Sequence, residues 1–245
     1  TNAVSNQLNK LVHAQQNCFF SHIEQEKLLD KMIGILPEKH DNIFFTNSGS
    51  EATDNAIKIA RMSTKKPNII TMKDGFHGRT LCAMSLTSSK ISYRQGFQPL
   101  IPGVFFCDDN IENFNYILEN QTSPDETCAF IMEPIIGEGG IREISCEFVK
   151  YARKVCSEYN IKLIFDEVQC GSGRTGHWWV SDKWGITPDI MTFAKGIGSG
   201  FPIGGVSANS EIFNTMTKNS LGGTYNGNVI STVAASQTID IIKEE

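Results

Sequence analysis

Short runs of consecutive apolar residues alternate along this chain with segments of helical periodicity. Such runs occur at 43–45, 69–72, 104–107, 129–132, 162–165 and 190–194. Helical spacing of apolar residues lies between several of them, near 51–62, 111–119 and 148–159. Short continuous apolar strands separated by helices are typical of a mostly parallel sheet that is covered on both faces. No Pro- or Gly-rich linker divides the 245 residues, so we expect one large α/β domain.

Helical patterns also occur at the two ends of the chain. Leu8, Leu11 and Val12 have helical spacing, and a second pattern from Ile23 to Leu36 stops before Pro37, so residues 1–40 form a predicted helical N-terminal part. The chain begins without Met, and residues 228–245 end inside a predicted helix. We therefore expect a fragment of a longer protein, whose targeting segment, if it has one, is not visible.

Composition excludes several functional classes. With 22 Lys and Arg against 27 Asp and Glu, the net charge of −5 argues against a nucleic-acid partner. No apolar stretch approaches the length of a membrane span, so no membrane partner is expected. The seven cysteines are scattered without a CxxC pair. This pattern predicts free thiols in a reducing compartment and no zinc or other metal site.

Polar clusters follow four of the predicted strands. They are Asn47 to Ser50, Glu133-Pro134, Asp166 to Gln169, and Lys195-Gly196. Ligands in open α/β sheets bind at the carboxyl ends of the strands. Because all four clusters occupy that position, they are candidates for one shared site.

Each cluster has a chemical and a structural interpretation. Ser48-Gly49-Ser50 suits a phosphate at a helix N-terminus, or is an ordinary helix cap. The carboxylate of Asp166 suits a metal, an arginine or a protonated ring nitrogen, or caps a turn. A lysine partly removed from water, at the place of Lys195, is a usable amine nucleophile, although most lysines simply reach solvent. The glycines after Lys195 lack the GK[ST] ending of a nucleotide-binding P-loop.

Six segments in order give the chain a resemblance to a known family. They are NSGSEA (47–52), GFHGRT (75–80), EPIIGEGG (133–140), FDEVQCGSGRTG (165–176), FAKGIGSGFPIGGV (193–206) and GGTYNGN (222–228). With them the chain resembles the class III pyridoxal-phosphate aminotransferases of fold type I. The resemblance implies that residues 1–245 are the cofactor-binding large domain, with a seven-stranded, mostly parallel sheet. The small C-terminal domain would lie beyond the end of the chain.

The resemblance also implies roles for individual residues. Lys195 would form the covalent link to pyridoxal 5′-phosphate, and Asp166 would pair with the pyridine nitrogen of the cofactor. These two residues would be the catalytic ones. Gln169 would bind the phenolic oxygen of the ring, and Phe76 would stack on its face beside His77. The other implied cofactor-binding residues are Ser48, Gly49 and Ser50 for the phosphate, Glu133 beside Gln169, and Thr224 for the phosphate in the neighbouring subunit.

Two further residues would select the substrate. Arg79 resembles the arginine that binds a substrate carboxylate, and Glu138 resembles a glutamate that pairs with a second arginine, expected beyond residue 245. The substrates would be an amino donor and a 2-oxo acid such as 2-oxoglutarate or pyruvate. The resemblance also implies a homodimer with its active site at the subunit interface. The reducing compartment that the cysteines indicate would be the cytoplasm or the mitochondrial matrix.

The subgroup is less sharply defined by the motifs. GGTYNGN and the last helix look most like the 4-aminobutyrate aminotransferases. The alanine–glyoxylate type and the acetylornithine and ornithine enzymes share most of the same motifs. Ile136, Asn226 and Val229 depart from the commoner residues of the family at their positions. A non-catalytic homologue is the alternative of a different class, but the chain retains Lys195, Asp166, Gln169 and Ser50.

Overall fold

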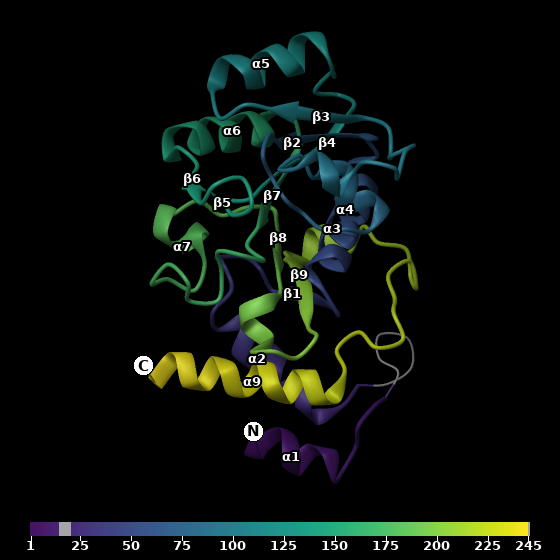
Figure 1. The fold of residues 1–245 in the computed structure, drawn as a ribbon, viewed down its shortest axis with the longest axis vertical. Helices are drawn as coiled ribbons and strands as arrows, with labels where there is room; N and C mark the ends of the chain where they lie inside the picture. The colour runs from purple at the N-terminus through teal and green to yellow at the C-terminus, as the bar shows by residue number, and fades with distance from the viewer. Residues whose placement is uncertain (15–20, 245) are drawn as a thin grey trace.

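A seven-stranded sheet forms the centre of the molecule (Figure 1). The computed structural model describes residues 1–14 and 21–244. In spatial order the strands are β1 (Asn42–Thr46), β9 (Gly204–Ala208), β8 (Ile190–Phe193), β7 (Lys162–Asp166), β4 (Thr127–Met132), β2 (Asn68–Met72) and β3 (Val104–Cys107). β9 runs antiparallel to its neighbours β1 and β8. The remaining neighbours pair in parallel, which confirms the predicted mostly parallel sheet.

The apolar runs predict six of these strands, and β9 is the one they miss. Its sequence, Gly-Gly-Val-Ser-Ala, holds one β-branched residue and two glycines. A Cβ on Gly205 would overlap the ring of Phe193 on the neighbouring strand. Small residues are therefore required where β9 passes that ring. As a result β9 has few of the β-branched and aromatic residues by which a strand is usually recognised.

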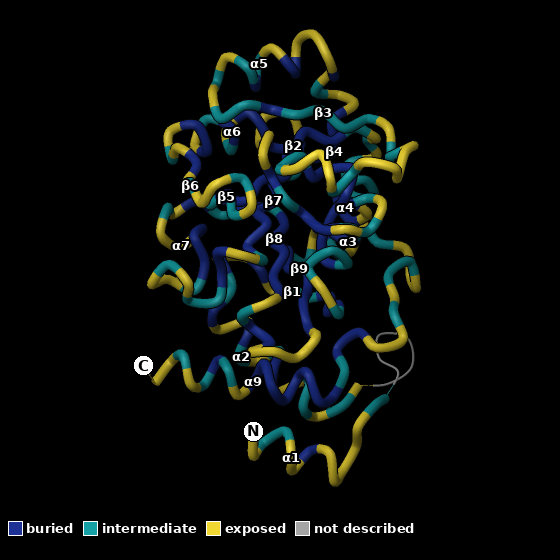
Figure 2. Tube along the Cα trace, viewed as in Figure 1, coloured by how far each residue is buried: buried dark blue, intermediate teal, exposed yellow. Residues whose placement is uncertain are grey.

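Helices cover both faces of the sheet. On one face, α3 (Gly49–Thr64), α4 (Leu81–Leu86) and α8 (Ser210–Phe213) pack against alternate strand residues such as Ile131 and Ile164. On the other, α5 (Ile111–Asn120) and α6 (Cys146–Glu158) pack against Phe130 and Phe165. Successive strand residues point to opposite faces, and both sets are buried (Figure 2). This burial on both sides explains why the strands read as continuous apolar runs.

A second group of helices covers the β1 end of the sheet. α2 (Ile23–Ile33) and α9 (Val229–Glu244) lie side by side and share a core with Phe45, Met191 and Phe193. α1 (Asn2–Leu8) lies along α9 near the chain ends (Figure 1). The predicted continuation of this first helix through Leu11 and Val12 is wrong. Both side chains are about half-exposed, so no packing holds another turn there. Cys18 lies outside the described residues.

Short elements complete the chain. They are the 3₁₀ turns η1 (Ile91–Tyr93) and η2 (Lys195–Gly198), the hairpin of β5 (Ile135–Ile136) and β6 (Arg142–Glu143), and α7 (Val180–Trp184). Within the described ranges, no helix is long and apolar enough to cross a membrane. β1, β4, β7 and β8 run in the same direction, so the polar clusters that follow them meet at one edge of the sheet.

Candidate active site

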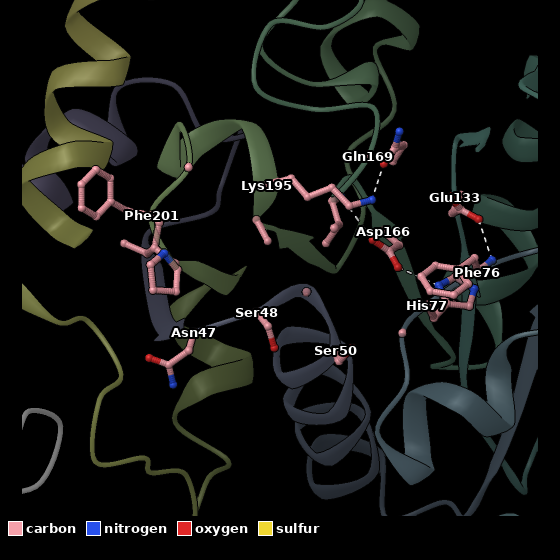
Figure 3. Close-up of a pocket in the computed structure, with 17 residues that line it drawn as sticks. Asn47, Ser48, Ser50, Phe76, His77, Glu133, Asp166, Gln169, Lys195 and Phe201 are labelled. Atoms are coloured by element: carbon pink, nitrogen blue, oxygen red, sulfur yellow. Dashed lines mark hydrogen bonds and ion pairs between the residues drawn. The ribbon is translucent and has the colours of Figure 1, made fainter. Parts of the chain in front are cut away.

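A cavity of about 420 Å³ lies at this edge. Figure 3 shows the side chains that surround it, drawn from strand ends, from the start of α3 and from the loop after β8. The predicted cofactor-binding residues that line it are Ser48, Gly49, Ser50, Phe76, His77, Glu133, Asp166, Gln169 and Lys195. These positions span almost 150 residues of sequence, and the fold brings them around one space.

Asp166 is held rigidly at the end of β7. Its Oδ1 accepts hydrogen bonds from the Val168 backbone N–H and the Thr192 hydroxyl, both at 3.1 Å. Its Oδ2 accepts from Nδ1 of His77 at 2.7 Å. Asp166 is 2% exposed, so these donors replace the water that an ionised carboxylate requires. The bond from Val168 also closes a turn, which confirms the structural interpretation of Asp166; its role toward a cofactor stays a prediction.

His77 lies beneath the cavity, and both of its ring nitrogens have acceptors. Nδ1 donates to Asp166, and Nε2 lies 3.3 Å from Oγ1 of Thr71, whose own hydrogen goes to the Leu86 carbonyl. Burial alone lowers the pKa of His77, but the hydrogen bond and charge of Asp166, with the charge of Glu133, outweigh it and raise the pKa above its usual value. The contacts therefore favour a protonated His77 that stabilises the charge of Asp166.

Glu133 joins two loops at the cavity wall. Its Oε1 accepts from the Phe76 N–H at 2.8 Å, and its Oε2 accepts from the Gly137 N–H at 3.2 Å. Burial, together with the charge of Asp166, raises the pKa of Glu133 to about 7, although the charge of His77 and the two backbone hydrogen bonds oppose the rise. The carboxylate thereby fixes the backbone on which Phe76 is carried.

Lys195 and Gln169 meet across the cavity. The Lys195 amine donates a hydrogen bond to Oε1 of Gln169 (Figure 3). Lys195 has a φ of +46°, in the left-handed region that non-glycine residues rarely adopt. The Lys195 side chain is exposed in this single chain, and it lines the cavity. η2, which begins at Lys195, follows β8 directly at the cavity wall. Among the described residues, none covers the Lys195 amine on its cavity side.

The start of α3 forms the opposite wall. Ser48 caps the helix by accepting from the Glu51 N–H at 3.3 Å. The first N–H groups of a helix lack partners within it and carry a partial positive charge. A Cβ on Gly49 would lie 2.8 Å from Cγ1 of Val168, and one on Gly78 would lie 2.9 Å from Cα of Ser50. Glycine is thus required at both places for the helix start to reach the cavity.

Further lining residues lie inside the recognised segments, although no role is predicted for them. Asn47 and Val168 flank predicted residues, and Phe201, Pro202 and Ile203 come from the loop that leads into β9. Asn47 donates to Glu51 and to Oδ1 of Asn226, so the 222–228 segment is tied to the α3 start. Loop residues have no periodicity. Their place in the 193–206 segment, beside Lys195, is the signal that could have indicated that this loop returns to the site.

The predicted substrate-binding residues lie outside the main cavity. Glu138 lines an adjoining pocket of about 310 Å³ together with Phe76, Gln169 and Lys195. Arg79 is exposed, and its guanidinium stacks at 4.6 Å from the ring centre of Tyr93. Tyr93, for which the sequence offers no signal, also packs edge-on against Phe76 at 5.2 Å.

Thr224 is exposed and lines neither of these cavities. Its implied role is toward a neighbouring subunit, so within one chain it stays a prediction.

Comparison with known proteins agrees with this geometry. The model of the aminotransferase class-III family matches residues 1–245. The chain is 38% identical to the 5-aminovalerate aminotransferase DavT of Pseudomonas aeruginosa and 36% identical to the 4-aminobutyrate aminotransferase GabT of Escherichia coli. It is 39% identical to the acetylornithine aminotransferase of Methanocaldococcus jannaschii. Each match covers 99% of this chain and 60% of the relative, so the chain spans about three-fifths of their length.

Solved structures show the same fold. A transaminase from the marine bacterium Virgibacillus superposes with a TM-score of 0.93 at 31% identity, over 99% of this chain and 59% of that one. The ω-transaminase of Pseudomonas jessenii, solved with PMP, gives 0.90 at 30% identity, over 99% and 60%. The chain therefore belongs to the class III aminotransferases, a family of enzymes that depend on pyridoxal 5′-phosphate and act on amino donors and 2-oxo acids.

Proposed function

We propose that the protein containing this chain transfers an amino group from an ω-amino acid of the 4-aminobutyrate kind to a 2-oxo acid such as 2-oxoglutarate. One observation carries the amino-transfer chemistry: an amine (Lys195), a buried carboxylate (Asp166) and a helix N-terminus with serine hydroxyls face one cavity. These are the groups that the carbonyl, the ring nitrogen and the phosphate of pyridoxal phosphate require. The glycine contacts at Gly49 and Gly78 keep the phosphate end of the cavity open. The ω-amino-acid class is supported by the similarity to the 5-aminovalerate and 4-aminobutyrate aminotransferases.

Each residue that lines the cavity has its own role in the proposed reaction. When bound, pyridoxal phosphate supplies an electron sink for the bond that breaks at the amino carbon. Asp166, held by its three donors, keeps a proton on the ring nitrogen. Ser48, Gly49 and Ser50 bind the phosphate, Phe76 covers the ring, and Gln169 orients the ring oxygen. The free amine of Lys195 moves the proton to and from the amino carbon of the substrate.

We also propose the arrangement of the complete protein. Residues 1–245 serve as its cofactor-binding domain, with residues 1–40 as a helical N-terminal part and residues 228–245 leading toward a smaller domain. A homodimer places Thr224 near the cofactor phosphate of the other subunit. The six cysteines of the described segments are unpaired, which supports a reducing compartment, the cytoplasm or the mitochondrial matrix.

Trapping of the cofactor tests the assignment of Lys195. We expect pyridoxal phosphate to give the complete protein a visible absorbance band that Lys195→Ala abolishes. Reduction with borohydride followed by peptide mapping is expected to find the cofactor on Lys195. Lys183→Ala, which alters a lysine outside both cavities, is the control and should retain the band. A label on a different lysine contradicts the assignment.

A panel of amino donors tests the substrate class. The acetylornithine relative is as similar to this chain as the ω-amino-acid relatives, and this makes transfer from acetylornithine the second candidate. We expect 4-aminobutyrate and 5-aminovalerate to react faster in single half-reactions than acetylornithine, ornithine or alanine. A reversed order favours the second candidate.

A further inference from the structure

The Asn47 side chain is anchored from two sides at the phosphate end of the cavity. Its Nδ2 donates to Oε2 of Glu51 at 3.0 Å and to Oδ1 of Asn226 at 2.7 Å, so both hydrogens of the amide have acceptors. The Asn47 backbone N–H also donates to Oε2 of Glu51, at 2.8 Å. Glu51 belongs to the first turn of α3, and Asn47 directly precedes Ser48, which caps this helix (Figure 3). The bond to Asn226 therefore influences the position of the helix start.

Asn226 is buried and closely packed, as an anchor must be. It is 3% exposed, and its backbone N–H donates to the Gly223 carbonyl at 3.2 Å. A Cβ on Gly223 would lie 2.5 Å from Oδ1 of Asn226. Glycine at position 223 thus leaves the space in which the Asn226 amide turns back toward Asn47.

The turn that carries Asn226 is fixed by further contacts. Nε2 of His22, the residue that caps α2, lies 3.2 Å from the Gly227 carbonyl oxygen. Oδ1 of Asn228 accepts from the Ile230 N–H at 3.0 Å, at the start of α9. Because these contacts join the turn to two packed helices, the Asn226 side chain has little conformational freedom left to lose when it binds Asn47.

We propose that Asn226 is a positioning residue that acts through Asn47 and holds the start of α3 where Gly49 and Ser50 bind the cofactor phosphate. The inference rests on the proposed function and deepens it, because Asn226 lines neither cavity and yet supports the phosphate end of the site. Without the Asn226 oxygen, one hydrogen of the Asn47 amide loses its acceptor and the side chain is free to turn. The helix start then loses its fixed aim at the phosphate.

A comparison of pyridoxal phosphate with pyridoxal, which lacks the phosphate, tests the proposal on the complete protein after removal of its cofactor. Spectral titration gives a dissociation constant for each compound. We expect Asn226→Ala to weaken binding of pyridoxal phosphate by about three- to tenfold, the order of effect of one hydrogen bond. Binding of pyridoxal should not change, because the groups that face its ring stay in place.

Two more variants and a matched control accompany this measurement. Asn47→Ala should reduce the preference for the phosphate compound as well, and adding Asn226→Ala to it should have no further effect. Gly223→Ala, which crowds the Asn226 amide, should act in the same direction. At the opposite end of β1, Nδ2 of Asn42 donates to Oγ of Ser210 at 2.9 Å, and Asn42→Ala should leave both dissociation constants unchanged.

Two results overturn the proposal. An unchanged ratio of the two dissociation constants in Asn226→Ala means that the residue has no specific influence on the phosphate end. An effect of Asn226→Ala that persists in the Asn47→Ala background means that Asn226 acts by another route, such as through Thr224 in the same turn. Neither result alters the attachment of the cofactor to Lys195, so failure of this inference and failure of the proposed function are separable.

Discussion

Asp166 accepts hydrogen bonds from two kinds of donor. His77 is a buried side chain that carries a charge when protonated, whereas the Thr192 hydroxyl is neutral. Removing one partner of a buried ion pair leaves the other charge without compensation, which costs more than losing a neutral hydrogen bond. The two donors should therefore differ in their effect on stability and on cofactor binding.

We expect His77→Leu to lower the free energy of unfolding by about 3–5 kcal/mol and to weaken pyridoxal-phosphate binding. Thr192→Val, which removes a neutral donor from the same carboxylate, should cost about 1–2 kcal/mol. Urea denaturation and spectral titration with the cofactor measure the two effects. Equal losses in the two variants would show that His77 acts as a neutral donor.

The sequence predicts which residue types surround the site but not how they pair. Asp166 and Lys195 come directly after apolar runs, where a charged residue is conspicuous. The bond between His77 and Asp166 depends on the spatial order of β2, β4 and β7, which no local pattern encodes. Tyr93 lies in a short 3₁₀ turn without apolar periodicity, so its contacts with Arg79 and Glu138 emerge only from the folded chain.

At the scale of elements, the start of α3 touches the loop after β7. Gly49 permits this approach, since an added Cβ would lie 2.8 Å from Val168. Its backbone does not need the left-handed region, and alanine is intrinsically the better helix residue. Steric conflict alone therefore opposes a substitution there.

We expect Gly49→Ala to shift the helix start and weaken binding of the cofactor phosphate, with about 1–3 kcal/mol of strain. Gly49→Ala combined with Val168→Ala should recover much of the loss, because the second change removes the atoms in conflict. Titration with pyridoxal phosphate is the measurement. A double variant no better than Gly49→Ala would place the cause elsewhere than in this contact.

Six of the seven strands can be recognised in the sequence, and β9 cannot. Six strands are visible as apolar runs because helices bury both of their faces. β9 is hidden because its neighbours allow only small side chains beside Phe193. Packing against Phe193 requires the glycines of β9. Because β9 is not recognised in the sequence, the position of the loop before it, with Phe201 to Ile203 at the cavity wall, is not predicted either.

For the whole molecule, buried carboxyls link stability to pH. Glu167 accepts from the Ser181 N–H at 3.0 Å and from the Cys170 thiol. Burial raises the pKa of Glu167 to about 7, from 4.5, against the opposing backbone hydrogen bonds. Between these values the folded chain holds a proton that the unfolded chain has released. Its contribution to stability is therefore complete below about pH 4.5 and disappears as the pH rises through about 7.

We expect Glu167→Gln to flatten the fall in unfolding free energy between pH 5 and pH 7. The gap between 4.5 and about 7 corresponds to about 3 kcal/mol at most. Glutamine keeps an oxygen for the Ser181 N–H but does not titrate. Urea denaturation at a series of pH values measures the difference. Parallel profiles for the variant and the wild type would contradict the role of this carboxyl.

The reversed direction of β9 limits how this site can vary. The segment between Phe193 and Gly204 contains Lys195 and also the wall from Phe201 to Ile203, and both of its ends are fixed by pairing in the sheet. An insertion there would displace the lysine and the wall together. We therefore expect relatives that retain this strand order to keep the length of this segment and to vary it by substitution alone.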